Sequence, residues 1–105
     1  MDTFEAMTVA LLETDGWPPN LSALPLEAQG LLGSLFFIQW RMGSVPDDPH
    51  EAGELASQMS PNDEVETTIR LWPVIRPYFD ETPAPGLMRA RRVEKAREWM
   101  VNRNE

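Results

Sequence analysis

The sequence predicts a compact, mainly α-helical domain, and three observations support this prediction. Apolar residues recur at helical spacing in several separate segments. Proline and acidic residues stand together where helices would begin, as in Asp48-Pro49-His50-Glu51. Only one short stretch, residues 87–91, alternates apolar and basic residues in the way a strand does. The 105 residues suffice for one core, and we assign residues 1–105 to a single domain.

The composition excludes several classes of protein. The chain has no cysteine, so disulfides, thiolate zinc sites and cysteine nucleophiles are excluded. Its apolar runs, such as Leu35 to Ile38, are far shorter than the ~20 residues that a membrane-spanning helix needs. The acidic start MDTFEAM also lacks the basic segment of a signal peptide. We therefore expect a cytoplasmic protein without a membrane partner.

Two helices are expected in the first part of the chain. Phe4, Met7 and Leu11 share one face of a helix within residues 1–16, which Asp15-Gly16 would end. The clearest helix covers residues 25–42, with Pro25 at its first position. Its apolar stripe comprises Ala28, Leu31, Leu35, Ile38 and Met42, and Leu32 and Phe36 widen it.

Two glycines interrupt the predicted core helix. Gly30 and Gly33 each cost about 1 kcal/mol relative to alanine inside a helix. This cost predicts that another element packs closely against the surface that carries them.

The acidic stretch after Arg41 could hold a metal ion or begin a helix. Asp48 fits an N-cap, with Pro49 as the first helical residue and Glu51 as the third, and this predicts a helix over residues 48–59. Its narrow apolar face consists of Ala52, Leu55, Ala56 and Met59. A metal site would combine His50 with Asp47, Glu51 and Glu54, but a single histidine without a second nitrogen or sulfur ligand binds transition metals poorly. The loop also lacks the regular acidic ladder of a calcium site.

Catalytic residues are not evident either. His50 is the only histidine, and no Ser-His-Asp arrangement stands out. We expect no enzymatic activity, no metal and no cofactor.

The same capping pattern recurs at Ser60-Pro61-Asn62-Asp63, and it predicts a helix over residues 61–72. Val65, Ile69 and Trp72 would form its inner face. Pro73 and Pro77 then predict a kinked or restarted turn that carries four residues into the core: Val74, Ile75, Tyr78 and Phe79.

A last helix is expected over residues 92–103, with Val93, Ala96 and Met100 inward. A long helix, two short helices, an extended piece and a terminal helix follow one another in the order of a winged-helix-like variant. The prediction includes at most a short strand or wing near residues 87–91.

Three segments of this chain, LSALPLEAQGLLGSLFFIQWRMGSVPDD, LWPVIRPYFDE and GLMRARRVEKARE, carry a family resemblance. The chain resembles the YdaU-like domain of phage and prophage proteins, a family of unknown function often found at the N-terminus of replication-associated proteins. The resemblance covers about residues 17–98. Its most specific part is LEAQG followed by Gln39-Trp40, Gly43 and VPDD. It implies a phage- or prophage-type winged-helix module, and the family defines no catalytic residues to transfer.

The net charge of −8 is unevenly distributed. Residues 1–81 hold 14 acidic and three basic residues, whereas residues 82–105 hold three acidic and six basic residues. The body of the protein should therefore repel phosphate, while the C-terminal segment RARRVEKAR could contact a nucleic-acid backbone at short range.

Two functional hypotheses follow from this polarity. In the first, an acidic surface binds a protein partner that is basic or nucleic-acid-binding, as an adaptor or inhibitor. Its residues would be Asp47, Asp48, Glu51, Glu54, Asp63, Glu64 and Glu66. In the second, the helix pair binds DNA during phage replication, with Arg89, Arg91, Arg92, Lys95 and Arg97 on phosphates. We favour a protein partner because the second helix of the pair carries Asp63, Glu64 and Glu66 against only Arg70.

Overall fold

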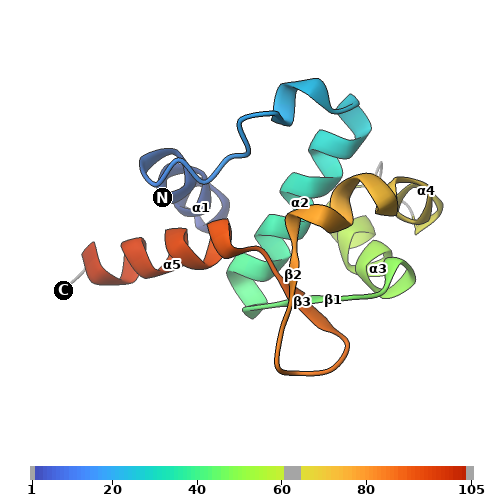
Figure 1. The fold of residues 1–105 in the computed structure, drawn as a ribbon. Coiled ribbons are helices and arrows are strands. Elements are labelled where there is room, and N and C mark those ends of the chain that lie inside the picture. The colour runs from blue at the N-terminus through green and yellow to red at the C-terminus, as the bar shows by residue number, and fades with distance from the viewer. Residues whose placement is uncertain (1, 61–64, 104–105) are drawn as a thin grey trace.

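The structure is a computed structural model that describes residues 2–60 and 65–103. Five α-helices make up most of it, which confirms the predicted mainly α fold (Figure 1). They are α1 (Thr3–Glu13), α2 (Leu26–Met42), α3 (Pro49–Met59), α4 (Val65–Ile75) and α5 (Arg91–Arg103). Two 3₁₀ turns, η1 (Leu21–Ala23) and η2 (Arg76–Tyr78), precede α2 and follow α4.

Three short strands form an antiparallel sheet in the order β1-β3-β2. They are β1 (Val45–Pro46), β2 (Asp80–Glu81) and β3 (Leu87–Arg89). Val45 pairs with Met88, and Asp80 pairs with Arg89. β2, β3 and the five residues that join them form a hairpin, here called the wing, which projects from the helices (Figure 1). β3 lies where the alternating pattern placed a strand. β1 and β2 have only two residues each, too few for a pattern to reveal.

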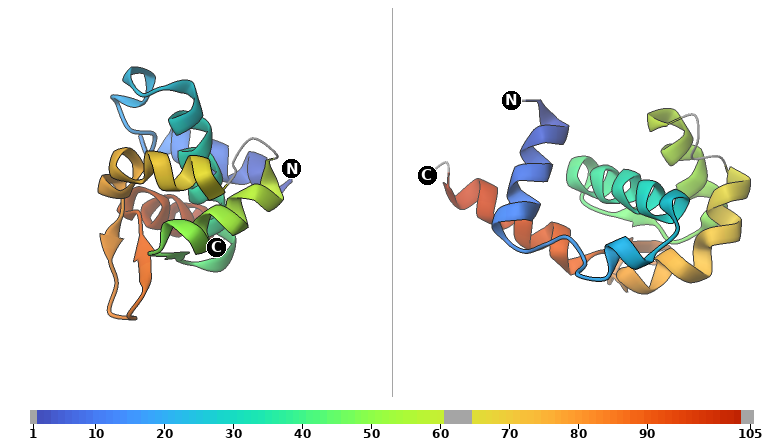
Figure 2. Two further views of the ribbon diagram at one scale, coloured as in Figure 1. Left: turned by 90° about the vertical axis from the view of Figure 1, so that its right-hand side faces the viewer. Right: turned by 90° about the horizontal axis from the view of Figure 1, so that it is seen from above.

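The core is built around α2, which lies between α1 on one side and the pair α3 and α4 on the other (Figures 1 and 2). All seven residues of its predicted stripe except Met42 are buried. Met42 is 64% exposed because it is the last residue of the helix, in an open hollow beside Leu55 and Met59. In α1, Met7 and Leu11 are buried as expected, but Phe4 is 49% exposed and packs edge-on against Phe37.

Local side-chain contacts fix where the helices begin and end. Asp48 caps α3 as predicted, because its Oδ2 accepts a hydrogen bond of 3.1 Å from the backbone N–H of Glu51. At α2, Pro25 is the N-cap rather than the first helical residue, since its ψ of 147° is extended. α2 ends at Gly43, whose φ of 93° places it in the left-handed region that favours glycine.

The predicted inner face of α4 was wrong by about one residue. Thr68, Leu71 and Ile75 are buried, whereas Ile69 is 49% exposed.

α4 also continues through Pro73 to Ile75 instead of ending at residue 72. Pro73 is exposed, so the helix carries it on its solvent side near its end, where the missing N–H disturbs little. Of the residues expected to enter the core after it, Ile75 and Phe79 do, Tyr78 is half-buried and Val74 is exposed. The predicted cap at Pro61 to Asp63 lies outside the described residues.

The expectation of close packing at Gly30 and Gly33 was wrong. A Cβ built on either glycine meets no heavy atom within 4 Å. The close approach occurs instead at Gly53 in α3, where a Cβ would lie 2.9 Å from the Cα of Val65. Gly53 therefore sets the distance between α3 and α4.

A buried amide joins α2 to the start of α5. Gln39 is fully buried, and its Nε2 donates to the carbonyl oxygen of Ala90 at 2.9 Å. Its Oε1 accepts from the backbone N–H of Ala90 at 2.7 Å. The side chain thus pairs with one residue as a neighbouring strand would, and it fixes the short link between the wing and α5.

Gln39→Leu should lower the free energy of unfolding by about 1–3 kcal/mol, because it leaves the buried N–H of Ala90 without an acceptor. Urea denaturation followed by circular dichroism measures this change. The matched control is Gln58→Leu on an exposed position of α3, where we expect a change within about 0.5 kcal/mol. Equal midpoints for the two variants would show that the Gln39 pairing does not stabilise the fold.

Candidate interaction surface

The acidic residues at the start of α3 differ in what they contact. The side chain of Asp47 is three-quarters buried and forms a bidentate ion pair with Arg76. The distances are 2.8 Å from Arg76 Nε to Oδ1 and 2.9 Å from Nη2 to Oδ2. Arg76 also donates to the carbonyl oxygen of Phe79 at 2.6 Å. Asp47 therefore links β1 to η2 and contributes to the fold more than to an open acidic surface.

This ion pair is insensitive to pH on the arginine side. The hydrogen bonds that Arg76 donates to Asp47 raise the pKa of Arg76 above its ordinary value, against the opposing effect of burial. A raised arginine pKa adds stability that is present at every pH below the ordinary value and is lost only at extreme alkaline pH. Arg76, whose ion pair with Asp47 links β1 to η2, therefore keeps its positive charge at every pH below its ordinary pKa.

The other predicted acidic residues that the structure describes lie at the surface. Glu51 and Glu66 are exposed in the first turns of α3 and α4. Glu54 is exposed and pairs with His50 at 3.2 Å, while Asp48 is half-buried and caps α3. Asp63 and Glu64 lie outside the described residues.

The three arginines of residues 1–81 each contact a neighbouring group. Arg70 on α4 forms an ion pair with Glu27 of α2, and Arg76 is held by Asp47. Arg41 lies with its guanidinium carbon 5.8 Å from the ring centre of Phe37. Within the described residues, Asp48, Glu51 and Glu66 have no ion pair with a base. The helix pair α3 and α4 therefore presents a net negative surface.

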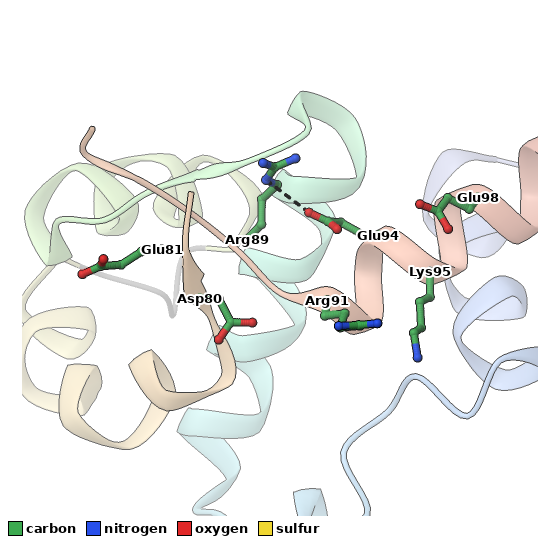
Figure 3. A pocket seen from close by; sticks show the side chains of 7 residues that line it. All are labelled: Asp80, Glu81, Arg89, Arg91, Glu94, Lys95 and Glu98. Carbon is green, nitrogen blue, oxygen red and sulfur yellow. Dashed lines mark ion pairs between the residues drawn. The ribbon is translucent and has the colours of Figure 1, made fainter. Parts of the chain in front are cut away.

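The predicted basic strip does not form one face. Arg89, Arg91 and Lys95 line a pocket of about 330 Å³ between the wing and α5 (Figure 3). Four carboxylates share this pocket, and one of them, Glu94, pairs with Arg89 at 3.2 Å. The other three are Asp80, Glu81 and Glu98. The pocket therefore offers mixed charge rather than a uniform site for phosphate.

The remaining two bases of the strip do not line this pocket. Arg92 donates to the carbonyl oxygen of Asp15, next to α1, at 3.3 Å. Arg97 lines a neighbouring hollow with Gly43 and Val101, and this hollow shares Arg89, Glu94 and Glu98 with the first pocket. The spacing of the arginines in the sequence did not reveal this division, because it depends on which neighbours α5 packs against.

Two further features are absent from the described part of the chain. No group of three or more histidine, cysteine, aspartate or glutamate residues there could hold a metal ion. Among the same residues, no helix has the length and apolar character needed to cross a membrane.

Comparisons with known proteins give no relative: no family model, no curated protein and no solved structure matches this chain.

Proposed function

We propose that this chain is a non-enzymatic interaction module of phage or prophage type that acts in the cytoplasm. Its acidic surface on α3 and α4 binds a protein that is itself basic or nucleic-acid-binding. The observation that supports this proposal most strongly is how the arginines of residues 1–81 are paired. Arg70 and Arg76 are both paired with carboxylates, while Glu51 and Glu66 stay exposed. An excess of exposed negative charge speeds association with a basic partner and disfavours DNA.

The fold alone does not decide between protein and DNA as the partner. In a winged helix-turn-helix that binds DNA, the second helix of the pair enters the major groove. Here that helix is α4, and its exposed charges are Glu66 and an arginine that Glu27 already neutralises. The tip of the wing, residues 82–86, has the sequence TPAPG and carries no base for a phosphate contact. Both features favour the protein partner.

A pull-down from a bacterial lysate tests the proposed surface, with the sample divided into nuclease-treated and untreated halves. We expect capture of the same protein in both halves, and loss of capture with the double variant Glu51→Lys and Glu66→Lys. The control is Glu98→Lys on α5, an equal change of charge per residue on a different element. Capture that disappears with nuclease, or that survives the double variant, would contradict the proposal.

DNA binding by the wild-type chain should be no tighter than about 10⁻⁴ M at physiological salt, the weak end of non-specific affinity. The acidic body opposes each phosphate contact that the C-terminal arginines make. Fluorescence titration of short duplex and single-stranded oligonucleotides at two salt concentrations measures this affinity. Micromolar binding would favour DNA instead if the logarithm of the association constant falls by about 0.9 per contacted phosphate for each tenfold rise in salt concentration. That affinity should then be lost on replacing Arg89, Arg91 and Arg92 by alanine.

A further inference from the structure

The tip of the wing, residues 82–86, is an exposed apolar projection. The wing points away from the helices in two perpendicular views, with the tip at its far end (Figures 1 and 2). Residues 83–86 are all exposed, and a Cβ built on Gly86 meets no heavy atom within 4 Å. The fold therefore leaves the rings of Pro83 and Pro85 largely uncovered.

A β-turn reverses the chain at the tip. The backbone N–H of Leu87 donates to the carbonyl oxygen of Ala84 at 3.4 Å. Pro85 and Gly86 are the two central residues of this turn, and Gly86 has a φ of 78°. Proline at the first central position and glycine with a positive φ at the second are typical of a type II turn. The local sequence therefore dictates the conformation of the turn.

Further hydrogen bonds hold the backbone on both sides of Pro85. Oγ1 of Thr82 accepts from the N–H of Ala84 at 3.2 Å and donates to the carbonyl oxygen of the same residue at 2.9 Å. The carbonyl oxygen of Gly86 accepts from the N–H of Asp47 at 2.9 Å, which ties the tip to the segment after β1. Each proline also has a fixed φ and restricts the residue before it. A partner would therefore lose little free energy in ordering the tip.

The charges of the wing disfavour a nucleic acid as the partner of its tip. Residues 77–88 contain two carboxylates and no lysine, arginine or histidine. Arg89, the only base of the wing, forms an ion pair with Glu94 of α5 at 3.2 Å. Arg91 and Lys95 line the pocket at the base of the wing, at the end away from the tip (Figure 3). The tip therefore offers apolar rings and no phosphate contact.

We propose that the tip of the wing inserts into an aromatic-lined groove of a partner protein. Pro83 and Pro85 present apolar rings on a backbone that is already ordered, and aromatic grooves recognise this combination in proline-rich segments. Pro85 is required by the turn, whereas Pro83 is not one of its two central residues and has an exposed ring. The site includes neither Glu51 nor Glu66, so it is independent of the function proposed above.

Photo-crosslinking at a single position of the full chain tests this proposal. The photoreactive amino acid p-benzoylphenylalanine replaces Ala84 at the tip, and in a control chain it replaces Glu13, an exposed residue of α1. Both chains are irradiated in a bacterial lysate, with and without nuclease, and the cross-linked peptides are identified by mass spectrometry. The probe at position 84, and not the probe at position 13, should cross-link one protein in both samples. The cross-linked peptide should contain tryptophan, tyrosine or phenylalanine.

Three variants separate recognition from folding. Pro83→Ala removes an exposed ring outside the turn, and it should lower the yield of the cross-link at position 84 roughly tenfold or more. Pro19→Ala makes the same change at an exposed proline before η1 and should leave the yield unchanged. The double variant Glu51→Lys and Glu66→Lys should also keep the cross-link, because it changes only the acidic surface on α3 and α4. Thermal melts of the three variants confirm that they fold.

Five outcomes would overturn the proposal. Position 84 yields no cross-linked protein, or it yields the same protein as position 13. The cross-linked peptide contains no aromatic residue. The cross-link disappears with nuclease, because a nucleic acid would then be the partner. The cross-linked protein is a second copy of this chain. Finally, the Pro83→Ala variant, still folded, cross-links as well as the wild type.

Discussion

Leu35→Ala should lower the free energy of unfolding by about 2–5 kcal/mol, one of the two largest effects of a single substitution that we expect. Leu35 is fully buried at the centre of α2, the helix that contacts each of the other four helices. Removal of its branched end leaves a cavity that the surrounding helices can close only in part. Denaturant midpoints, with the slope of the transition compared between variants, measure the loss.

The control for this substitution is Leu12→Ala in α1. Leu12 is 65% exposed, so the same chemical change should cost far less there. If Leu35→Ala and Leu12→Ala had similar midpoints, the assignment of Leu35 to the core would be wrong.

Gly53→Ala should destabilise the fold by about 1–3 kcal/mol, whereas the same substitution at Gly30 or Gly33 should stabilise it by about 0.5–1 kcal/mol. The added methyl group at Gly53 would lie 2.9 Å from the Cα of Val65 and 3.0 Å from Oγ1 of Thr68, so α3 and α4 must move apart. At Gly30 and Gly33 the methyl group meets open space, and only the better helix propensity of alanine counts.

Thermal melts of the three alanine variants under one condition test this difference in sign. All three positions are helical glycines, so the local chemistry of the substitution is the same in each variant. A higher melting temperature for Gly53→Ala, or a lower one for Gly30→Ala and Gly33→Ala, would contradict the packing described here.

The mainly α fold could be predicted because its signals are local. The cap at Asp48 and the apolar stripe of α2 each depend on residues within a few positions of one another, and the structure confirms both. The prediction of which residues of α4 face the core was wrong because the burial of Thr68 depends on Gly53 of another helix. The periodicity of apolar residues within α4 contains no information about that contact.

The candidate sites were less predictable, since charge counts do not show which charges neutralise each other. Asp47 belongs to the acidic segment, yet its partner Arg76 is 29 residues away. The open surface at Gly30 and Gly33 of α2 could not be predicted for a similar reason. A glycine inside a helix indicates either a close neighbour or an open surface, and only the placement of α1 and η1 distinguishes these two cases.

The pairing of Gln39 with Ala90 also has a consequence for the order of folding. It joins residues 51 positions apart, and the pairing of Val45 with Met88 spans nearly as much chain. Loops of this length close slowly, while α3 and α4 are neighbours in the sequence. We therefore expect the helices from α2 to α4 to assemble first, and the wing and α5 to join after the rate-limiting step. Substitution of Gln39 should then accelerate unfolding and leave the refolding rate almost unchanged, a kinetic signature that stopped-flow fluorescence would record.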